Sequence, residues 1–232
     1  MIFTPEIFLA LSVLLLIAIS PFLKRNGYVI AAYSSLLLVI IAQYFVFKDI
    51  FHFEEIYNGF FVIDSFGSFI KSLLLIGTGI ILYIYLINNK DSEINKIEFP
   101  ILILLSVIGM MLMVSSNDIL SLFVAMELQS LSLYILVAFS RNNKNSSEAG
   151  VKYFVLGSLS TCIFLFGSSL IYGFFGTTNF TEISNLISQI NDMPLILIFG
   201  VVFILVSLSL KISAAPFHMW TPDVYQGAPT II

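Results

Sequence analysis

The sequence predicts an all-α fold, a polytopic bundle of membrane-spanning helices. Hydrophobic residues make up 59% of the 232 residues and charged residues only 10%, which gives a mean hydropathy of +1.02. A soluble domain does not bury that much apolar surface, so lipid is the expected solvent. The apolar residues also fall into runs of about 20, the length that crosses a bilayer core of roughly 30 Å.

Seven spans and the start of an eighth are predicted. Pro100 and Pro194 suit the first turn of a helix, where the missing N–H costs nothing. Pro216 differs, because the apolar run continues past it, and it predicts a break in the seventh helix. An eighth span begins at Ala228–Ile232 and stops, which predicts a split coding sequence or a fragment. The expected spans are Ile7–Phe22, Val29–Phe47, Val62–Ile87, Ile101–Val114, Ile119–Phe139, Tyr153–Phe175 and a seventh from Pro194.

Loop charges predict the orientation of these spans. At one end the loops carry seven basic residues, whereas the other end carries only Lys48, so the N-terminus is expected outside. No loop is long enough for an extramembrane domain, and residues 1–232 are predicted to form one transmembrane domain. The net charge of −4 is spread out and indicates no nucleic-acid partner. The seven basic residues are Lys24, Arg25, Lys90, Lys96, Arg141, Lys144 and Lys152.

Glu127 lies inside the fifth apolar run, where a charge costs several kcal/mol. Such a residue is a functional candidate by default, usually in a proton or ion path. A buried carboxyl with a mobile cationic partner can load and release a proton. The alternative is a permanent pair that holds two helices together, although a buried ion pair is weak evidence for a gain in stability.

Lys211 lies in the seventh run, in a Ser-rich segment ahead of Pro216. The structural alternative is a side chain that snorkels to the inner face. Two features favour function instead: the apolar run extends beyond Lys211, and a helix broken at membrane depth is a common way to build an ion site. A lysine can also give up its proton, which an arginine does not.

Four further basic residues, discussed next, are weaker candidates for a functional role. Lys152 follows Glu148 at a spacing that suits a helical pair, with a solvated surface pair as the alternative. His218 follows the predicted break and suits proton relay, with capping of the broken helix as the alternative. Lys71, in the third span, is expected to snorkel to the outer face. His52 lies in a loop and is assigned no role.

The sixth span carries small residues four apart, which predict close helix packing. These pairs are Gly157/Thr161, Ser158/Cys162 and Ser169/Gly173. Cys162 is the single cysteine, and no metal site, phosphate-binding glycine loop, iron–sulfur ligand set or nucleophile triad is recognisable. We therefore expect no bound cofactor or metal and no redox chemistry in this chain.

Three segments carry a family resemblance. The run Met126–Leu136 (MELQSLSLYIL) and the segment Ser147–Phe154 (SEAGVKYF) resemble the fifth and sixth helices of chain 2 of proton-pumping NADH:ubiquinone oxidoreductase, respiratory complex I. The segment Leu210–Tyr225, with Lys five residues before Pro and then Phe-His-x-Trp-x-Pro-Asp, is similar to the antiporter-like superfamily as a whole. The ending Val-Tyr-Gln-Gly-Ala-Pro resembles chain 2 within it. The resemblance covers essentially the whole chain, at the N-terminal half of the family.

The resemblance implies fourteen helices, with two inverted five-helix repeats that each contain a broken helix. Residues 1–99 then correspond to three leading helices and residues 100–232 to most of the first repeat. Glu127 and Lys211 resemble the central acid–base pair of the first half-channel, Lys152 the bridging lysine and His218 the relay histidine.

By the same resemblance the chain is a membrane-arm subunit of an enzyme, NADH:ubiquinone reductase (H⁺-translocating). That complex uses NADH, FMN, iron–sulfur clusters and ubiquinone. The expected partners are other complex I membrane subunits, including a separate polypeptide with the C-terminal half. Abundant Ile, Phe, Asn and Lys indicate an AT-rich genome, so the mitochondrial inner membrane is expected, with the bacterial plasma membrane as the alternative.

Three alternatives stay open at this point. One is a cation/proton antiporter or its hydrogenase-linked relative, which shares the Lys-to-Pro-Phe-His motif but is expected to have a different ending. A second is the plastid relative that accepts electrons from ferredoxin. A third is a purely structural half-subunit, in which Glu127 and Lys211 would be replaceable without loss of activity.

Overall fold

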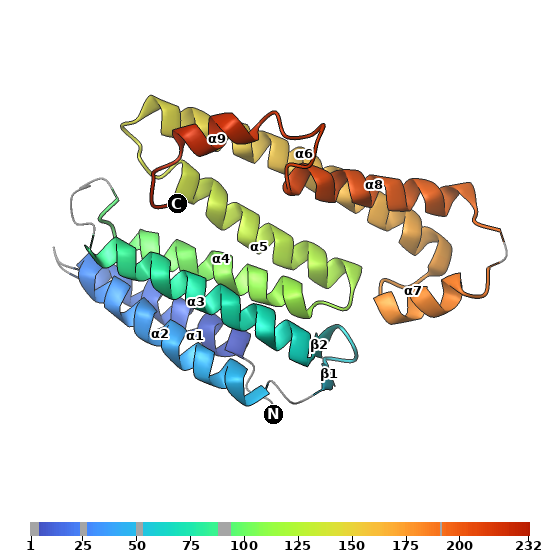
Figure 1. Ribbon diagram of the computed structural model, residues 1–232, viewed down its shortest axis with the longest axis horizontal. Coiled ribbons are helices and arrows are strands. Elements are labelled where there is room, and N and C mark those ends of the chain that lie inside the picture. The colour runs from blue at the N-terminus through green and yellow to red at the C-terminus, as the bar shows by residue number, and fades with distance from the viewer. Residues whose placement is uncertain (1–4, 24–26, 50–52, 88–93, 191) are drawn as a thin grey trace.

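The computed structural model describes residues 5–23, 27–49, 53–87, 94–190 and 192–232 as a bundle of roughly aligned helices (Figure 1). On one side lie α1 (Pro5–Ile19), α2 (Gly27–Asp49) and α3 (Ser65–Ile87). The centre is formed by α4 (Glu98–Ser115) and α5 (Ile119–Val137), and the other side by α6 (Lys144–Phe175), α8 (Leu195–Lys211) and α9 (Thr221–Gly227).

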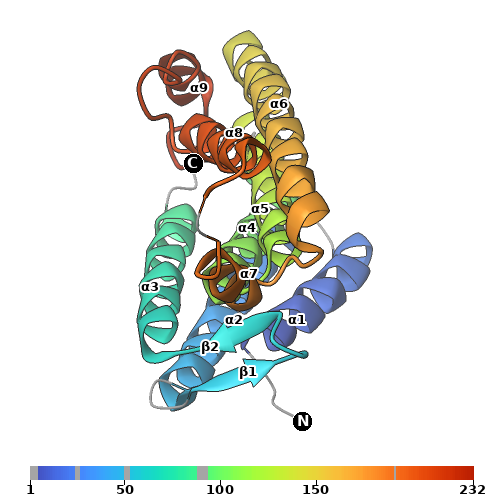
Figure 2. The same ribbon diagram turned by 90° about the vertical axis from the view of Figure 1, so that its right-hand side faces the viewer.

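Short elements cover one end of the bundle. The 3₁₀ turn η1 (Ser20–Phe22) extends α1. A hairpin of β1 (Glu54–Ile56) and β2 (Phe61–Ile63) lies at the same end as α7 (Phe180–Ile187), as Figure 2 shows. The Asn179 side chain, which caps α7, donates to the carbonyl of Gly59 in the hairpin at 3.1 Å. The hairpin and α7 were not predicted, because both are too short and mixed in composition to stand out between the apolar runs.

The helices have the length and surface of membrane spans. Within the described part of the chain, six helices (α1 with η1, and α2 to α6) are long and apolar enough to cross a bilayer, and α8 is a shorter apolar helix. Large apolar side chains such as Leu15, Ile40 and Tyr83 point outwards, each about 60% exposed. Such a surface suits lipid, and every backbone polar group inside a helix is already paired. The prediction of a polytopic all-α bundle is confirmed.

Two predicted boundaries are wrong. The third helix begins at Ser65 instead of Val62, because Val62 pairs with Glu55 in the hairpin. The sixth begins at Lys144 instead of Tyr153, because the side chain of Asn143 accepts the backbone N–H of Asn145 at 3.0 Å and caps the helix. The polar first turns of α6 carry no apolar signal, so the sequence pattern placed the start too late.

The break in the seventh helix lies earlier than Pro216. Lys211 is the last residue of α8, and Ser213 has a left-handed backbone (φ 56°). The N–H of Ala214 donates to the carbonyl of Ser209 at 2.9 Å, and the N–H of Ser213 to that of Leu210 at 3.4 Å. This is the hydrogen-bond pattern of a Schellman motif, which closes the helix and satisfies its last carbonyls. Lys211 is therefore the C-terminal residue of a helix.

Small residues let α6 and α8 approach closely. Ser160 and Ser207, both buried, bond each other's backbone carbonyls at 2.9 and 2.7 Å. A Cβ added to Gly167 would lie 2.8 Å from the carbonyl of Gly200. Of the predicted small pairs, Gly157/Thr161 faces α5, whereas Cys162 and Gly173 are exposed. Close packing of the sixth span is confirmed, but through different residues than the spacing indicated.

Lys71 does not snorkel, and that prediction is wrong. Its Nζ lies 2.6 Å from Oε1 of Glu6 on α1, and the two side chains are only 5% and 8% exposed. The pair joins α1 to α3 by charge in the apolar interior. Lys24, Arg25, His52 and Lys90 lie outside the described residues.

Candidate functional site

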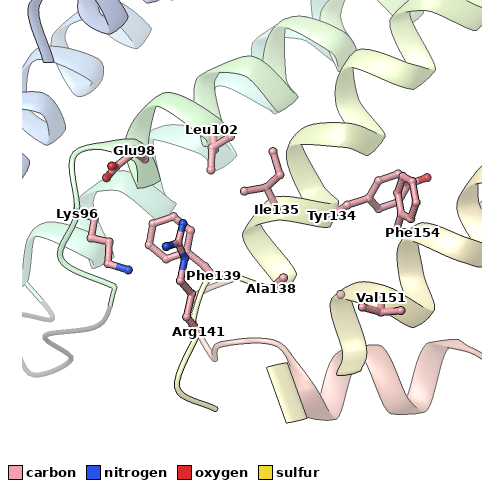
Figure 3. A pocket seen from close by; sticks show the side chains of 11 residues that line it. Lys96, Glu98, Leu102, Tyr134, Ile135, Ala138, Phe139, Arg141, Val151 and Phe154 are labelled. Carbon is pink, nitrogen blue, oxygen red and sulfur yellow. The ribbon is translucent and has the colours of Figure 1, made fainter. Parts of the chain in front are cut away.

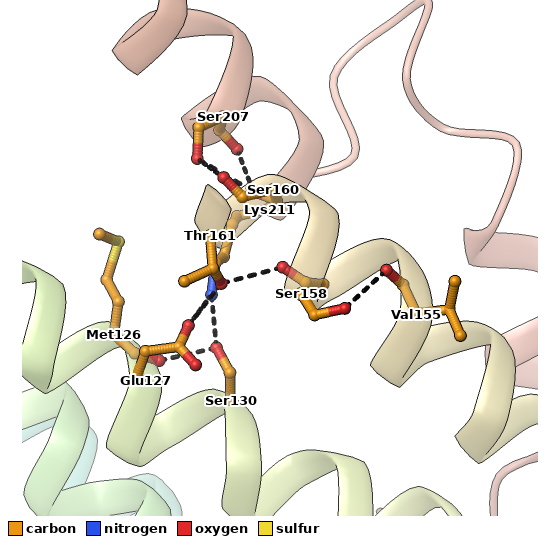
Figure 4. Close-up of polar contacts among 10 residues, drawn as sticks. Met126, Glu127, Ser130, Val155, Ser158, Ser160, Thr161, Ser207 and Lys211 are labelled. Carbon is orange, nitrogen blue, oxygen red and sulfur yellow. Dashed lines mark hydrogen bonds and ion pairs between the residues drawn. The ribbon is translucent and has the colours of Figure 1, made fainter. Parts of the chain in front are cut away.

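Glu127 lies at the middle of α5. The helix begins at Ile119 because the Asp118 carboxylate caps it, accepting the N–H groups of Leu120 and Ser121 at 2.8 and 3.2 Å. From there Glu127 lies about 12 Å along the axis, since each residue adds roughly 1.5 Å. Its side chain is 25% exposed and points away from α4 towards α6 and α8 (Figure 4).

Lys211 meets Glu127 from the end of α8. Its Nζ lies 3.2 Å from Glu127 Oε1, and its side chain is 18% exposed. As the last residue of α8, Lys211 also lies at the negative end of the helix dipole, equivalent to about half an elementary charge. The carboxylate and the helix end together stabilise the ammonium at mid-depth. The early break of α8 is therefore what positions this lysine.

Two hydroxyls complete the site. Lys211 Nζ donates to Ser130 Oγ at 2.8 Å, and Ser130 donates to the carbonyl of Met126 at 2.7 Å. Thr161 of α6 donates to Glu127 Oε1 at 2.6 Å, as Figure 4 shows. The acid and the base thus each have a neutral hydroxyl neighbour that can bond either charge state. We call these four residues, Glu127, Lys211, Ser130 and Thr161, the acid–base site.

Tyr134 separates the acid–base site from a larger cavity. A small cavity of about 20 Å³ is lined by Lys211, Ser130 and Tyr134. A second cavity of about 430 Å³, at the end of the bundle where α5 ends and α6 begins, is also lined by Tyr134. Ser130 and Tyr134 both line the small cavity beside Lys211, and Tyr134 also lines the larger one. Polar side chains are therefore placed between Lys211 and the larger cavity.

Gly157 provides the space for Tyr134. A Cβ added there would lie 1.9 Å from the Tyr134 hydroxyl oxygen. We predict that Gly157→Ala destabilises the protein by about 1–3 kcal/mol through overpacking, seen as a lower unfolding temperature of the purified protein. Gly173→Ala on the same helix is the matched control, because nothing lies within 4 Å of its added Cβ. An equal unfolding temperature for both variants would contradict the close contact of Gly157 with Tyr134.

Lys152 lies apart from the acid–base site. Its Nζ pairs with Glu148 at 2.8 Å, as the helical spacing predicts, and with Asp223 of α9 at 2.6 Å. Lys152 is about 13 Å along α6 from Thr161, nine residues at roughly 1.5 Å each. Its side chain is 41% exposed. The pairing attaches α9 to the beginning of α6, and any bridging role needs a different arrangement from this one.

His218 is also outside the acid–base site. It is exposed in the segment between α8 and α9, and its backbone carbonyl accepts the N–H of Thr221 at 3.2 Å. The segment is held by Thr221, which donates to Ser213 at 2.6 Å, and by the Trp220 indole, which donates to the carbonyl of Leu210 at 3.2 Å. Among the described residues no three His, Cys, Asp or Glu side chains are grouped as a metal site.

Sequence reasoning found the two charges but missed their immediate partners. Thr161 was noted only as a small packing residue, and Asp223 only as part of a motif. Hydroxyls in membrane helices usually bond their own backbone, so nothing in the sequence marks the ones that do not. The arrangement itself offers a carboxylate and an amine in direct contact in a low-dielectric interior. Such a pair can pass a proton between its members when its surroundings change.

A bundle of apolar helices with a Glu–Lys pair at mid-depth and a broken helix carrying the lysine defines an antiporter-like, multi-pass membrane protein. Residues 116–232 match the family described as "NADH:quinone oxidoreductase/Mrp antiporter, TM". The chain therefore belongs to the family of NADH:quinone oxidoreductase and Mrp antiporter transmembrane subunits. The matched part begins just ahead of α5 and contains all four residues of the acid–base site.

Individual relatives agree with this family. NADH-quinone oxidoreductase subunit N of Paramagnetospirillum magneticum is 42% identical over 232 residues, covering 97% of this chain and 47% of the relative. Subunit N of Bartonella bacilliformis is 46% identical over 235 residues, covering 98% and 46%. A chain of respiratory complex I from Thermus thermophilus superposes with a TM-score of 0.81 at 28% identity, covering 98% and 48%. The chain spans about half the length of the relatives it matches.

Proposed function

We propose that this chain is a core membrane-arm subunit of a proton-pumping NADH:quinone oxidoreductase, and that it carries part of a proton-translocation half-channel. The Glu127–Lys211 contact at 3.2 Å in the membrane interior is the observation that carries the proposal. The similarity to subunit N from two bacteria supports the respiratory assignment over a stand-alone antiporter. Pumping, rather than scaffolding, is supported because Lys211 lies at a helix break and each member of the pair has a hydroxyl neighbour that can bond either charge state.

In the proposed mechanism the acid–base site has two charge states. When Lys211 is protonated, it pairs with ionised Glu127 and bonds Ser130. When a proton moves from Lys211 to Glu127, both become neutral, and Thr161 can bond the carboxyl while Ser130 bonds the amine. Quinone reduction elsewhere in the complex biases the two states through charge changes along the membrane arm. Such coupling requires different interactions in each state, and distance alone does not supply it.

Lys152 and His218 take secondary roles in this proposal. Lys152 is the bridging residue that leaves Glu148 and Asp223 when the charge of the acid–base site changes. His218 relays the proton onward towards the rest of the subunit. Both assignments come from the family resemblance, and both need a conformation in which these side chains are nearer to Lys211 than they are here.

The chemistry of electron transfer is proposed to lie elsewhere in the complex. NADH, FMN, iron–sulfur clusters and ubiquinone are used by other subunits, and this chain binds none of them. Its proposed partners are the neighbouring membrane-arm subunits of the complex. Its abundance of Ile, Phe, Asn and Lys, which indicates an AT-rich genome, favours the mitochondrial inner membrane. The bacterial origin of the relatives favours a plasma membrane instead.

A mass-spectrometric inventory of the native membrane complex that contains this chain tests the assignment. We expect many respiratory subunits to be present together with this chain. If the chain migrates alone or with a few antiporter subunits, the respiratory assignment fails and the Mrp branch of the family applies.

Tyr134 provides a further prediction about proton entry. Tyr134→Phe keeps the ring, which packs edge-on against Tyr153 at 4.7 Å, and removes only the hydroxyl between the two cavities. We expect proton uptake from that end to slow at least about tenfold, less than for the central pair because a water can replace a hydroxyl. Tyr172→Phe is the matched control, because Tyr172 is exposed on α6 and lines neither cavity. Equal pumping rates in both variants would exclude Tyr134 from the proton path.

A further inference from the structure

The larger cavity has a form that the proton path does not explain. Its volume is about 430 Å³, and it lies between the first turns of α4, the end of α5 and the early turns of α6 (Figure 3). Leu102, Ile135, Val151 and Phe154 make its walls apolar. A proton needs only a narrow chain of polar groups or waters, so a wide apolar cavity calls for a different occupant.

Two basic residues stand at the rim of this cavity. Lys96 and Arg141 both line it, as Figure 3 shows, and Lys96 Nζ lies 5.2 Å from the centre of the Phe139 ring. Among the residues that the structure describes, neither has a salt-bridge partner within 4 Å. Glu98 also lines the cavity, so two cationic side chains stand against one carboxylate. The rim therefore has a net positive charge.

An apolar track leads from the cavity towards the middle of the membrane. On α5, Leu131 and Ile135 lie one turn apart and are 49% and 54% exposed. On the facing part of α6, Val151 and Phe154 line the same cavity and are 64% and 50% exposed. A hydrocarbon chain lying between these two helices would cover apolar surface on both, which is favourable in proportion to the area covered.

We propose that this cavity is a binding site for an anionic phospholipid of the membrane leaflet at the basic end of the bundle. Lys96 and Arg141 hold the phosphate, and an acyl chain follows the track of Leu131, Ile135 and Phe154. The charge at the rim fits an anionic headgroup, and basic pockets between membrane helices at the positively biased face attract such lipids. A free phosphate ion would use the rim alone and leave the apolar walls uncovered. This proposal stands independently of proton pumping.

The test uses the purified native complex and phosphatidylglycerol with a photoactivatable group in its acyl chain. Cross-links mapped by mass spectrometry are expected on the peptides that carry Ile135 and Phe154. Replacing both cations, Lys96→Gln with Arg141→Gln, is expected to lower this labelling roughly thirtyfold, and Lys144→Gln is expected to leave it unchanged. Lys144 is the matched control because it is exposed at the same end and does not line the cavity.

Further variants and competing ligands distinguish the possible occupants of the cavity. Val151→Trp fills the cavity but keeps the rim charges, and it is expected to lower the labelling as well. Equal labelling by phosphatidylcholine, unaffected by the charge variants, would overturn the proposal in favour of plain lipid contact. Displacement by inorganic phosphate would make a soluble anion the ligand and overturn the lipid assignment. No labelling of the wild-type complex would mean that another subunit covers the cavity, which also overturns it.

Discussion

Lys211→Met is expected to slow proton transfer through this chain at least about a hundredfold, the low end of what a positioned acid–base group contributes. Methionine keeps the length and apolar packing of the lysine stem, but it removes the ammonium that pairs with Glu127 at 3.2 Å and bonds Ser130 at 2.8 Å. The measurement is the rate of proton transfer by the complex reconstituted in vesicles during NADH oxidation, followed with a pH-sensitive dye.

The controls separate proton transfer from assembly. Lys144→Gln removes a basic residue from the exposed beginning of α6 and should leave pumping unchanged. Thr161→Val removes the hydroxyl that donates to Glu127 and should give an intermediate loss. Wild-type pumping in Lys211→Met, with the variant subunit present in the complex, would remove Lys211 from the mechanism and leave the chain as a structural half-subunit.

Glu6→Ala should have the largest effect on stability. It leaves the Lys71 ammonium, whose side chain is only 5% exposed, without its partner 2.6 Å away. Breaking a buried pair by removing one member costs about 3–5 kcal/mol, because the remaining charge stays buried and uncompensated. The expected result is a lower unfolding temperature of the purified protein.

A paired substitution provides the control for this prediction. Glu6→Gln together with Lys71→Met removes both charges and should lose far less stability than Glu6→Ala, since replacing a whole buried pair is often nearly neutral. Lys48→Ala, at an exposed position near the end of α2, should change little. If the single and the paired substitution destabilise equally, the charge pair is not what holds α1 to α3.

The helices could be predicted because a bilayer imposes a length on each apolar run. The predicted fifth span, which is bounded by polar residues, has nearly the same ends as α5. The predicted fourth span, which follows Pro100, has nearly the same ends as α4. The beginning of α6 could not be found in the same way, since its first turns are polar and extend beyond the apolar run. The hairpin and α7 depend on hydrogen bonds such as that from Asn179 to Gly59, which join residues far apart in the sequence.

Two of the four residues of the acid–base site could be predicted from the sequence. Glu127 and Lys211 stand out because charges are rare in apolar runs, and the structure brings them together. Lys71 carried the same signal, but Glu6 lies at the beginning of another helix, and nothing in the sequence links the two. The predicted break near Pro216 is present, and the left-handed Ser213 ends α8 at Lys211, five residues before the proline. The error over Lys71 comes from a tertiary contact that no local pattern encodes.

The central claim is that Glu127 exchanges a proton with Lys211 during turnover, and infrared difference spectroscopy of the complex tests it most directly. Reduction by NADH should produce a carboxyl band from protonated Glu127 that is absent in Glu127→Gln and shifted in Thr161→Val, because Thr161 donates to Oε1 at 2.6 Å. Identical carboxyl bands in the wild type and in Glu127→Gln would show that Glu127 keeps one protonation state throughout, and the account of this site would be wrong.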